Sequence, residues 1–156
     1  MQTNISILEA QPFLKGMTAQ QLELLAKDSV PAEFRAGEWI LNEGSNANRF
    51  YLIVEGQVEV ESKALEGEAV AIQTLGPGDV LGWSWLFPPF YWQFGAWAAT
   101  PTKAICFYGT HLRQVCEANH DLGYELMKRI SEIVIQRLQA VRRKLVEQNN
   151  HRPPPG

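Results

Sequence analysis

The stretch FYLIVEGQVEVE, residues 50–61, carries the pattern that decides the fold. An apolar run is followed by a glycine and then by a strict alternation, which indicates strand, turn and strand. In the second half Val58 and Val60 alternate with Glu59 and Glu61, so the valines share one face of a strand and the acids share the other. We therefore expect a sheet with one covered and one solvated face here.

Short β-prone runs separated by glycines continue on both sides of this stretch. We expect strands over residues 33–34, 38–41, 50–55, 58–61, 70–75, 80–81, 94–99 and 104–108, with a hairpin tip at 66–68. Several short strands at this spacing are typical of an all-β sandwich or roll. The predicted fold class is mainly β with flanking helices (α+β): a double-stranded β-helix or jelly roll with short N-terminal helices and a long C-terminal helix.

Helical patterns occupy both ends of the chain. Residues 5–27 predict short helices, and Thr18-Ala-Gln-Gln is a capping-box start. After residue 109 a short helix over 111–118 precedes a long one from about Leu122 to Gln148. Apolar residues recur along the long helix at spacings of three or four, which predicts pairing with another chain. The alternative is that the helix lies back on the roll. The predicted dimer seam contains Ile130, Val134, Leu138, Val141 and Leu145.

Length and composition indicate one ordinary globular domain. The chain has 156 residues, of which 46% are apolar and 20% charged. We expect a single domain over 1–148, divided into N-terminal helices (1–29), a β-roll (30–109) and C-terminal helices (110–148), with a disordered tail over 149–156. The net charge of −3 gives no global reason to expect nucleic-acid binding.

Neither a signal peptide nor a membrane-spanning run is expected, and the two cysteines, Cys106 and Cys116, match no disulfide framework or metal-binding spacing. We therefore expect a cytoplasmic protein.

The segment 76–104 is unusually aromatic and unusually interrupted. It opens with Gly-Pro-Gly-Asp, contains a double proline at 88–89 and holds eight aromatic residues between Trp83 and Trp97. Such a segment is unlike a plain connection between strands, because the prolines and glycines exclude one long helix or strand.

The glycine pattern resembles a known family. Ala36-Gly37-Glu38, then Glu43-Gly44-Ser45, then residues 50–60 resemble the cyclic-nucleotide-binding domain of the catabolite activator (CRP/FNR-like) superfamily. Gly44, Tyr51 and Gly56 stand at the spacing of that family's roll turns, and residues 76–82 resemble the entry to its phosphate-binding cassette. The resemblance covers about residues 7–145 and implies the family's β-roll with a C-terminal helix.

The resemblance also implies which positions of the cassette contact a ligand. In the family, a Glu after the cassette glycine accepts the ribose hydroxyl, and a later Arg pairs with the cyclic phosphate at a helix N-terminus. Here Gly82 is followed by Trp83, and the arginine position holds Gln93. The segment between Lys63 and Lys103 contains neither lysine nor arginine. Loss of a charge-assisted contact of this kind costs a few kcal/mol. Cyclic AMP or cyclic GMP is therefore not expected to bind by the usual mechanism. The candidate ligand-binding residues are Gly82, Trp83, Ser84, Trp85, Gln93, Phe94 and Gly95.

Three interpretations of the cassette aromatics remain open. In the first, Trp83, Trp85, Trp92 and Trp97 line a pocket for a flat or apolar ligand. In the second, the aromatics fill the roll where a nucleotide would otherwise lie. In the third, residues 87–92 form an aromatic surface for a partner protein.

Catalytic and metal chemistry find no support in the sequence. His111, His120 and His151 all follow the roll, so they cannot form a cupin-like metal cluster inside it. Ser84 lacks the second glycine of a nucleophile elbow. Catabolite-activator relatives carry a DNA-reading helix-turn-helix after the long helix, whereas the eight residues 149–156 are too few for one.

We therefore expect a non-enzymatic sensor module that needs no cofactor or metal. It would take a small-molecule or nucleotide ligand, form a homodimer and signal to a partner protein through its C-terminal helix. The alternative is a ligand-free dimeric scaffold that uses the aromatic cassette as its partner surface.

Overall fold

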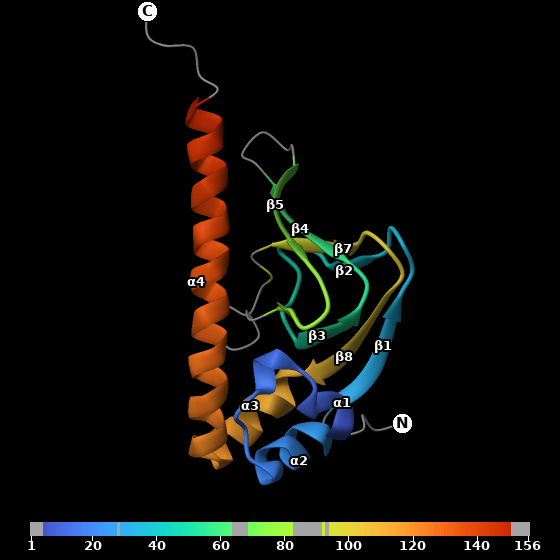
Figure 1. Ribbon diagram of the computed structural model, residues 1–156, viewed down its shortest axis with the longest axis vertical. Coiled ribbons are helices and arrows are strands. Elements are labelled where there is room, and N and C mark those ends of the chain that lie inside the picture. Colours follow the sequence, from blue (N-terminus) through green and yellow to red (C-terminus); the bar gives the residue numbers. More distant parts are fainter. Residues whose placement is uncertain (1–4, 28, 64–68, 83–91, 93, 151–156) are drawn as a thin grey trace, which may run out of the picture.

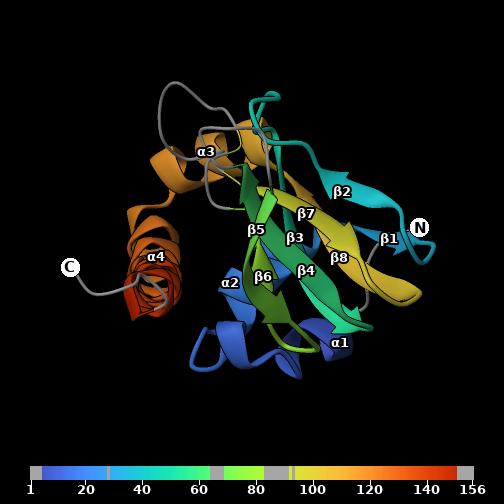
Figure 2. The same ribbon diagram turned by 90° about the horizontal axis from the view of Figure 1, so that it is seen from above.

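The computed structural model describes residues 5–27, 29–63, 69–82, 92 and 94–150. Within these residues two four-stranded antiparallel sheets form a roll, with short helices at one end and a long helix along one side (Figure 1). Seen from above, the long helix stands beside the roll (Figure 2). The predicted jelly roll with flanking helices is confirmed.

The strands are distributed over the two sheets out of chain order. The first sheet has the order β1 (Ser29–Phe34), β8 (Thr102–Tyr108), β3 (Arg49–Glu55), β6 (Val80–Leu81). The second has the order β2 (Trp39–Leu41), β7 (Gly95–Ala98), β4 (Val58–Lys63), β5 (Ala69–Leu75). Lys63 pairs with Ala69, so the predicted β4–β5 hairpin is confirmed, although its tip at 66–68 lies outside the described residues.

Strand β3 is covered on both faces, which explains the unbroken apolar run in its sequence. Phe50 and Leu52 pack with the helices in one core cluster. Tyr51 and Ile53 point the other way, into a second cluster inside the roll. The run that opens residues 50–61 is therefore shared between two cores.

The neighbouring turn and strand β4 behave as the alternation predicts. Val58 and Val60 are fully buried inside the roll, while Glu59 and Glu61 are partly exposed. Gly56 between the strands has φ +102°, and a Cβ there would lie 2.6 Å from the carbonyl oxygen of Pro101. Glycine is required at this turn both by its backbone conformation and by the close approach of another strand.

The N-terminal helices close one end of the roll. They are α1 (Ile5–Glu9), the 3₁₀ turn η1 (Pro12–Leu14) and α2 (Ala19–Lys27). The predicted capping box is confirmed: the Thr18 amide donates to Oε1 of Gln21 at 3.0 Å, and the Gln21 amide donates to Oγ1 of Thr18 at 3.1 Å.

Two helices complete the fold, α3 (Gly109–Ala118) and α4 (His120–Asn150), which ends two residues beyond the predicted end at Gln148. The 31 residues of α4 correspond to about 45 Å of helix, more than the roll covers (Figure 1). Leu122, Leu126 and Ile130 bury their side chains against the rest of the chain. No helix in the described part of the chain is both long and apolar enough to span a membrane.

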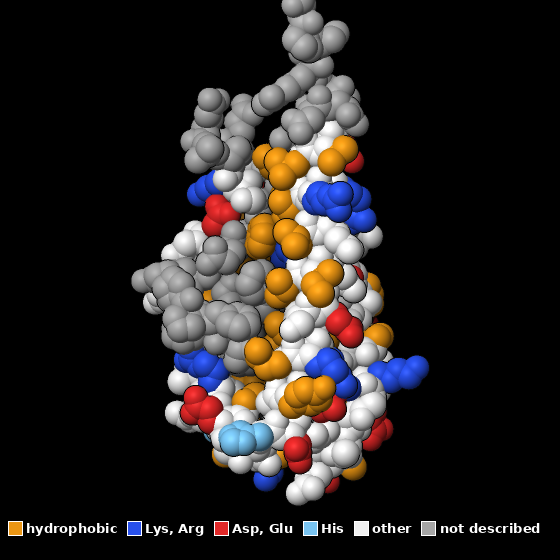
Figure 3. All heavy atoms as spheres, turned by 90° about the vertical axis from the view of Figure 1, so that its left-hand side faces the viewer, with side chains coloured by type: hydrophobic (Ala, Val, Ile, Leu, Met, Phe, Trp, Pro, Cys, Tyr) orange, Lys and Arg blue, Asp and Glu red, His pale blue; other side chains and the backbone are white. Residues whose placement is uncertain are grey.

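One residue of the predicted dimer seam is misplaced. Ile130 is 1% exposed and belongs to the core of its own chain, so it is unable to lie in a seam with another chain. The other four predicted residues lie elsewhere on α4: Leu138 and Leu145 are 66% and 56% exposed, and Val134 and Val141 are partly buried. Hydrophobic side chains follow the helix along its length (Figure 3).

Candidate ligand-binding site

The turn that opens the cassette is fixed by its own backbone and side chains. The Gly76 amide donates to Oδ2 of Asp79 at 2.8 Å, and the Asp79 amide donates back to the Gly76 carbonyl at 3.0 Å. The Gly78 amide, at φ +90°, donates to the carbonyl of Ile53 at 2.8 Å. The Gly-Pro-Gly-Asp signal therefore forms a tight turn tied to strand β3.

Gly82 marks the point where the chain leaves strand β6 and enters the cassette. Its φ is +89°, and a Cβ at this position would lie 2.9 Å from Cζ3 of Trp92. The indole of Trp92 is 6% exposed and belongs to the core inside the roll. Its backbone is held by residues 44 and 45, because the Gly44 amide donates to the Trp92 carbonyl and the Trp92 amide donates to the Ser45 carbonyl, each at 2.9 Å.

Trp92 thus fills part of the roll interior and does not line an open pocket. For this residue the second interpretation of the aromatics, a filled roll, describes the structure. Trp97 departs from the pocket interpretation in another way. Its neighbours on β7, Ala96 and Ala98, are fully buried, so Trp97 lies on the opposite face of the strand, paired with the 48%-exposed Trp39. Trp97 therefore faces away from the roll interior that Trp92 occupies.

The remaining candidate residues divide into two groups. Phe94 packs, partly buried, against the core inside the roll, and Gly95 begins β7 beneath the ring of Trp39, whose Cζ3 lies 3.2 Å from a Cβ built on that glycine. Trp83, Ser84, Trp85 and Gln93 lie outside the described residues, as do residues 87–91.

An arginine from outside the cassette reaches its C-terminal end. Arg137 of α4 is 4% exposed, and its guanidinium carbon lies 5.3 Å from the centre of the Phe94 ring. Its Nε donates to Oε1 of Gln73 on β5 at 2.8 Å. Burial lowers the pKa of Arg137 to about 10, an effect that the charge of Asp79 opposes, so the side chain is still a cation at neutral pH.

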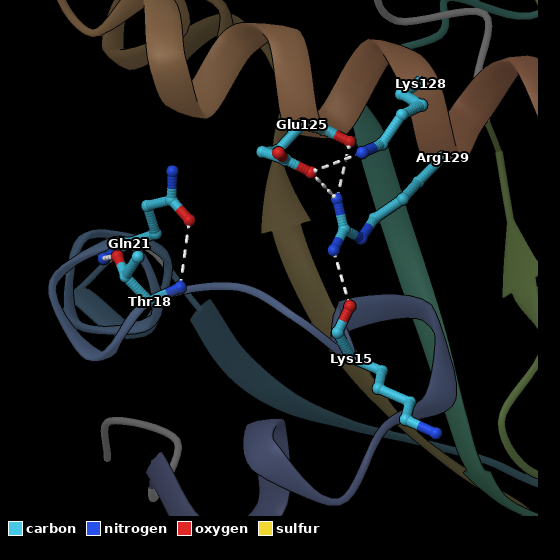
Figure 4. Close-up of polar contacts among 6 residues, drawn as sticks. All are labelled: Lys15, Thr18, Gln21, Glu125, Lys128 and Arg129. Carbon is cyan, nitrogen blue, oxygen red and sulfur yellow. Dashed lines mark hydrogen bonds and ion pairs between the residues drawn. The ribbon is translucent and has the colours of Figure 1, made fainter.

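A cleft of about 400 Å³ lies where α4 passes the roll. It runs from η1 past the 76–79 turn to the middle of α4, and Gln73, Asp79 and Arg137 are among its lining residues. At its lower end α4 is fastened to the N-terminal segment: Arg129 donates through Nη2 to the Lys15 carbonyl at 2.5 Å and pairs through Nη1 with Glu125, which also pairs with Lys128 at 3.2 Å (Figure 4).

A second arginine, Arg49 at the start of β3, lies at the edge of the roll interior. It interacts with the phenol of Tyr51, and its guanidinium lies 5.7 Å from the centre of the Tyr108 ring. Burial raises the pKa of the Tyr51 phenol and of the Cys106 thiol behind it, so both groups are protonated at neutral pH. Arg137 and Arg49 lie outside the cassette in sequence, so the cassette residues alone give no indication of these two cations.

The sequence of α4 contains a signal for the burial of Arg137. The residue falls on the same face of α4 as Ile130 and Ile133, where a helix that packs on a domain carries apolar residues. A charge on that face requires a partner. Among the described residues no group of three or more His, Cys, Asp or Glu side chains is placed to hold a metal ion.

The comparisons with known proteins agree with this architecture. Residues 31–119 match the family model of the cyclic nucleotide-binding domain. A CRP-like cAMP-activated global transcriptional regulator of Mycobacterium tuberculosis is 24% identical over 122 residues, which are 78% of this chain and 54% of the regulator. The chain thus spans about half the length of this curated relative.

Two solved structures extend the likeness to three dimensions. A Geobacter metallireducens protein named for cyclic nucleotide binding has 29% identity and a TM-score of 0.78, over 87% of this chain and 98% of that one. A regulatory subunit of a cAMP-independent protein kinase A from Trypanosoma cruzi, bound to guanosine, has 25% identity and a TM-score of 0.70, over 82% and 44%.

The two antiparallel sheets and the long C-terminal helix form the β-roll architecture of cyclic nucleotide-binding domains. With the family match over 31–119, the chain belongs to the cyclic nucleotide-binding domain family.

Proposed function

We propose that this chain is a non-enzymatic regulatory module in which a ligand bound at the roll changes the position of α4, and that α4 passes this change to a second copy of the chain and to a partner protein. The module acts in the cytoplasm, where its two cysteines, both free, stay reduced. Domain boundaries at 1–148 belong to the same proposal.

The observation that carries the proposal is the contact between α4 and the end of the cassette. Arg137 touches Phe94, immediately before β7, and bonds Gln73 on β5. A ligand that enters or leaves this region must change the surroundings of a buried α4 side chain. A ligand that binds two arrangements of α4 unequally shifts their populations.

The face of α4 that adjoins the one with Arg137 supports the pairing step. Val134, Leu138, Val141 and Leu145 follow a spacing of four, three and four, which is the heptad spacing of a coiled-coil seam. Tyr124 and Met127 continue it toward the N-terminus at 65% and 41% exposure. A stripe of this length is more apolar surface than a solvated helix ordinarily shows.

The ligand is proposed to be a nucleotide or nucleoside held without the family's usual Glu and Arg. Trp83 and Gln93 stand at those two positions, and residues 64–102 contain no cation. The guanosine-bound kinase regulatory subunit is a relative whose bound ligand carries no phosphate. The candidate cassette contacts remain Gly82, Trp83, Ser84, Trp85, Gln93, Phe94 and Gly95.

A thermal-shift and tryptophan-fluorescence titration with cyclic AMP, cyclic GMP, guanosine and adenosine tests the proposal. A bound ligand at 100 times its Kd stabilises the fold by about 2.7 kcal/mol, and Trp92 beside Gly82 provides a local fluorophore. We expect at least one of the four to raise the melting temperature. Silence of all four, in melting and in fluorescence, would contradict the ligand-sensing function.

A second candidate function rests on the burial of Trp92. If the indoles fill the roll, the protein is a ligand-free dimeric scaffold that uses its aromatic cassette as a partner surface. In that case Trp92→Ala opens a cavity and lowers the free energy of unfolding by about 3–5 kcal/mol without changing any ligand response. Under the sensing function the same substitution also changes the affinity for whichever ligand binds.

A further inference from the structure

Arg137 reaches from α4 to two residues of the roll, Gln73 and Phe94. Across the second sheet, Ala96, Val60 and Gln73 form one row of directly paired residues on β7, β4 and β5. Directly paired residues of antiparallel strands point to the same face. Val60 and Ala96 belong to the core inside the roll, so Gln73 faces the interior as well, and Arg137 continues this row from α4.

The guanidinium is buried beside neutral partners. Its bonded acceptor is the Gln73 amide oxygen, its stacking partner is the Phe94 ring, and no carboxylate of the described residues lies within ion-pair distance of it. Asp79 acts on it only at longer range, and the Asp79 carboxylate accepts a bond from the Gly76 amide. Burial of a charge without a counter-charge costs free energy of folding, and a buried charge in a protein is ordinarily paired.

Arg137 combines unbonded donors with a place in the lining of the cleft. Only Nε of Arg137 is bonded within the described part of the chain, which leaves the two Nη groups available to a further acceptor. Arg137 lines the 400 Å³ cleft, whose size falls within the range of small-ligand sites. Lys15, Lys128 and Arg129 also line the cleft, together with Asp79 and Glu132, and Lys128 and Arg129 are paired with Glu125.

We propose that Arg137 is the anion-binding residue of this domain: α4, instead of the cassette, supplies the cation that binds the phosphate of a mononucleotide-sized ligand in the cleft between α4 and the roll. The fork of Nη groups matches two phosphate oxygens, and the Phe94 ring and Gln73 hold the fork in place. The inference rests on the proposed sensing function and names the ligand class for it.

This placement couples the ligand directly to α4. In a cassette that carries its own arginine, the phosphate bonds are made to the roll. Here they are made to the helix that carries the seam residue Leu138 at the next position. A bound phosphate adds charge-assisted bonds only to the arrangement in which α4 lies on the roll, so it favours that arrangement.

The test compares Arg137→Met with Arg142→Met, an exposed arginine five residues further along the same helix. Cyclic AMP, 5′-AMP, inorganic phosphate and uncharged guanosine are titrated against each protein and against the unsubstituted chain, with melting temperature and tryptophan fluorescence as readouts. Loss of a charge-assisted phosphate contact corresponds to about a 10- to 100-fold loss of affinity. We expect that loss for phosphate-bearing probes in Arg137→Met alone, with guanosine unaffected.

A second measurement keeps the proposal falsifiable. Arg137→Met removes an uncompensated buried charge, so it should melt at the same temperature as the unsubstituted chain or higher without ligand, and phosphate should no longer raise that temperature. If phosphate-bearing probes bind Arg137→Met and the unsubstituted chain equally, the Arg137 inference is wrong and the sensing function is unaffected. Phosphate silence in the unsubstituted chain overturns it too. A response to inorganic phosphate without any response to nucleotides or nucleosides supports the Arg137 site and contradicts the proposed ligand.

Discussion

The two faces of α4 are both apolar, yet they have different occupants. One face, with Leu122, Leu126 and Ile130, packs against the helices and strands of its own chain. The other face shows Leu138 and Leu145 at 66% and 56% exposure, with nothing from the described part of the chain over them. An apolar stripe at helical spacing therefore indicates burial without indicating what covers it.

The faces also differ in how they end. Along the inner face the apolar residues give way to Arg137, where the helix passes the cassette. Along the outer face they continue to Leu145, five residues before the end of α4. The inner face is suited to sense what occupies the roll, and the outer face is suited to a second chain.

The largest expected effect is the loss in free energy of unfolding when a residue of the inner face is truncated. Leu126→Ala removes a side chain that is 1% exposed, and large-to-small substitutions in a core cost about 2–5 kcal/mol. Leu138→Ala on the outer face leaves no cavity in the isolated chain. Urea unfolding at a series of protein concentrations separates them: the Leu126→Ala loss should be the same at every concentration, and any Leu138→Ala loss should vanish on dilution. Equal, concentration-independent losses would remove the distinction between the faces.

A smaller effect concerns the residues that fasten the inner face. Arg129 and Lys128 both pair with Glu125, but only Arg129 also bonds the Lys15 carbonyl of the N-terminal segment (Figure 4). Arg129→Met should lower the free energy of unfolding by about 1.5–3 kcal/mol, the value of a hydrogen bond to a charged group. Lys128→Met, which removes an exposed pair, should cost less than about 1 kcal/mol. Similar losses in urea unfolding would show that the Lys15 contact contributes nothing.

The smallest effect is the pH dependence of this fastening. Hydrogen bonds from Arg129 and then Lys128 hold the pKa of Glu125 below its ordinary value of 4.5. A carboxyl group with a lowered folded-state pKa stabilises the fold fully above its unfolded pKa, and this contribution is lost as the pH falls through the folded pKa. Melting temperatures of Glu125→Gln and the unsubstituted chain should therefore differ at neutral pH and converge as the pH falls through the folded-state pKa, which lies below 4.5. A constant difference across that range would contradict the assignment.

Much of the architecture was predictable because its signals are local. Three local signals each predict a backbone conformation that the structure contains: the alternation at residues 58–61, the Thr18–Gln21 capping box, and the glycines at 44 and 56. Both glycines have positive φ. Such signals depend on a residue and its immediate neighbours. They can be recognised without knowing which elements pack against each other.

The errors share one cause. Ile130 lies in the core of its own chain and not on the predicted seam, because periodicity fixes which residues share a face and leaves open which face turns inward. Arg137 was overlooked because its partners, Gln73 and Phe94, are 64 and 43 positions away along the chain. Contacts at such separation follow from the fold alone.

Pairing of the outer face of α4 with a second copy of this chain is measured by sedimentation equilibrium. Leu138→Lys and Gln139→Lys are matched substitutions at adjacent exposed positions, of which only Leu138 lies on the seam. We expect the unsubstituted chain and Gln139→Lys to sediment as dimers at micromolar concentration and Leu138→Lys to sediment as a folded monomer. A monomeric unsubstituted chain, or a Leu138→Lys dimer as tight as the Gln139→Lys dimer, would contradict it.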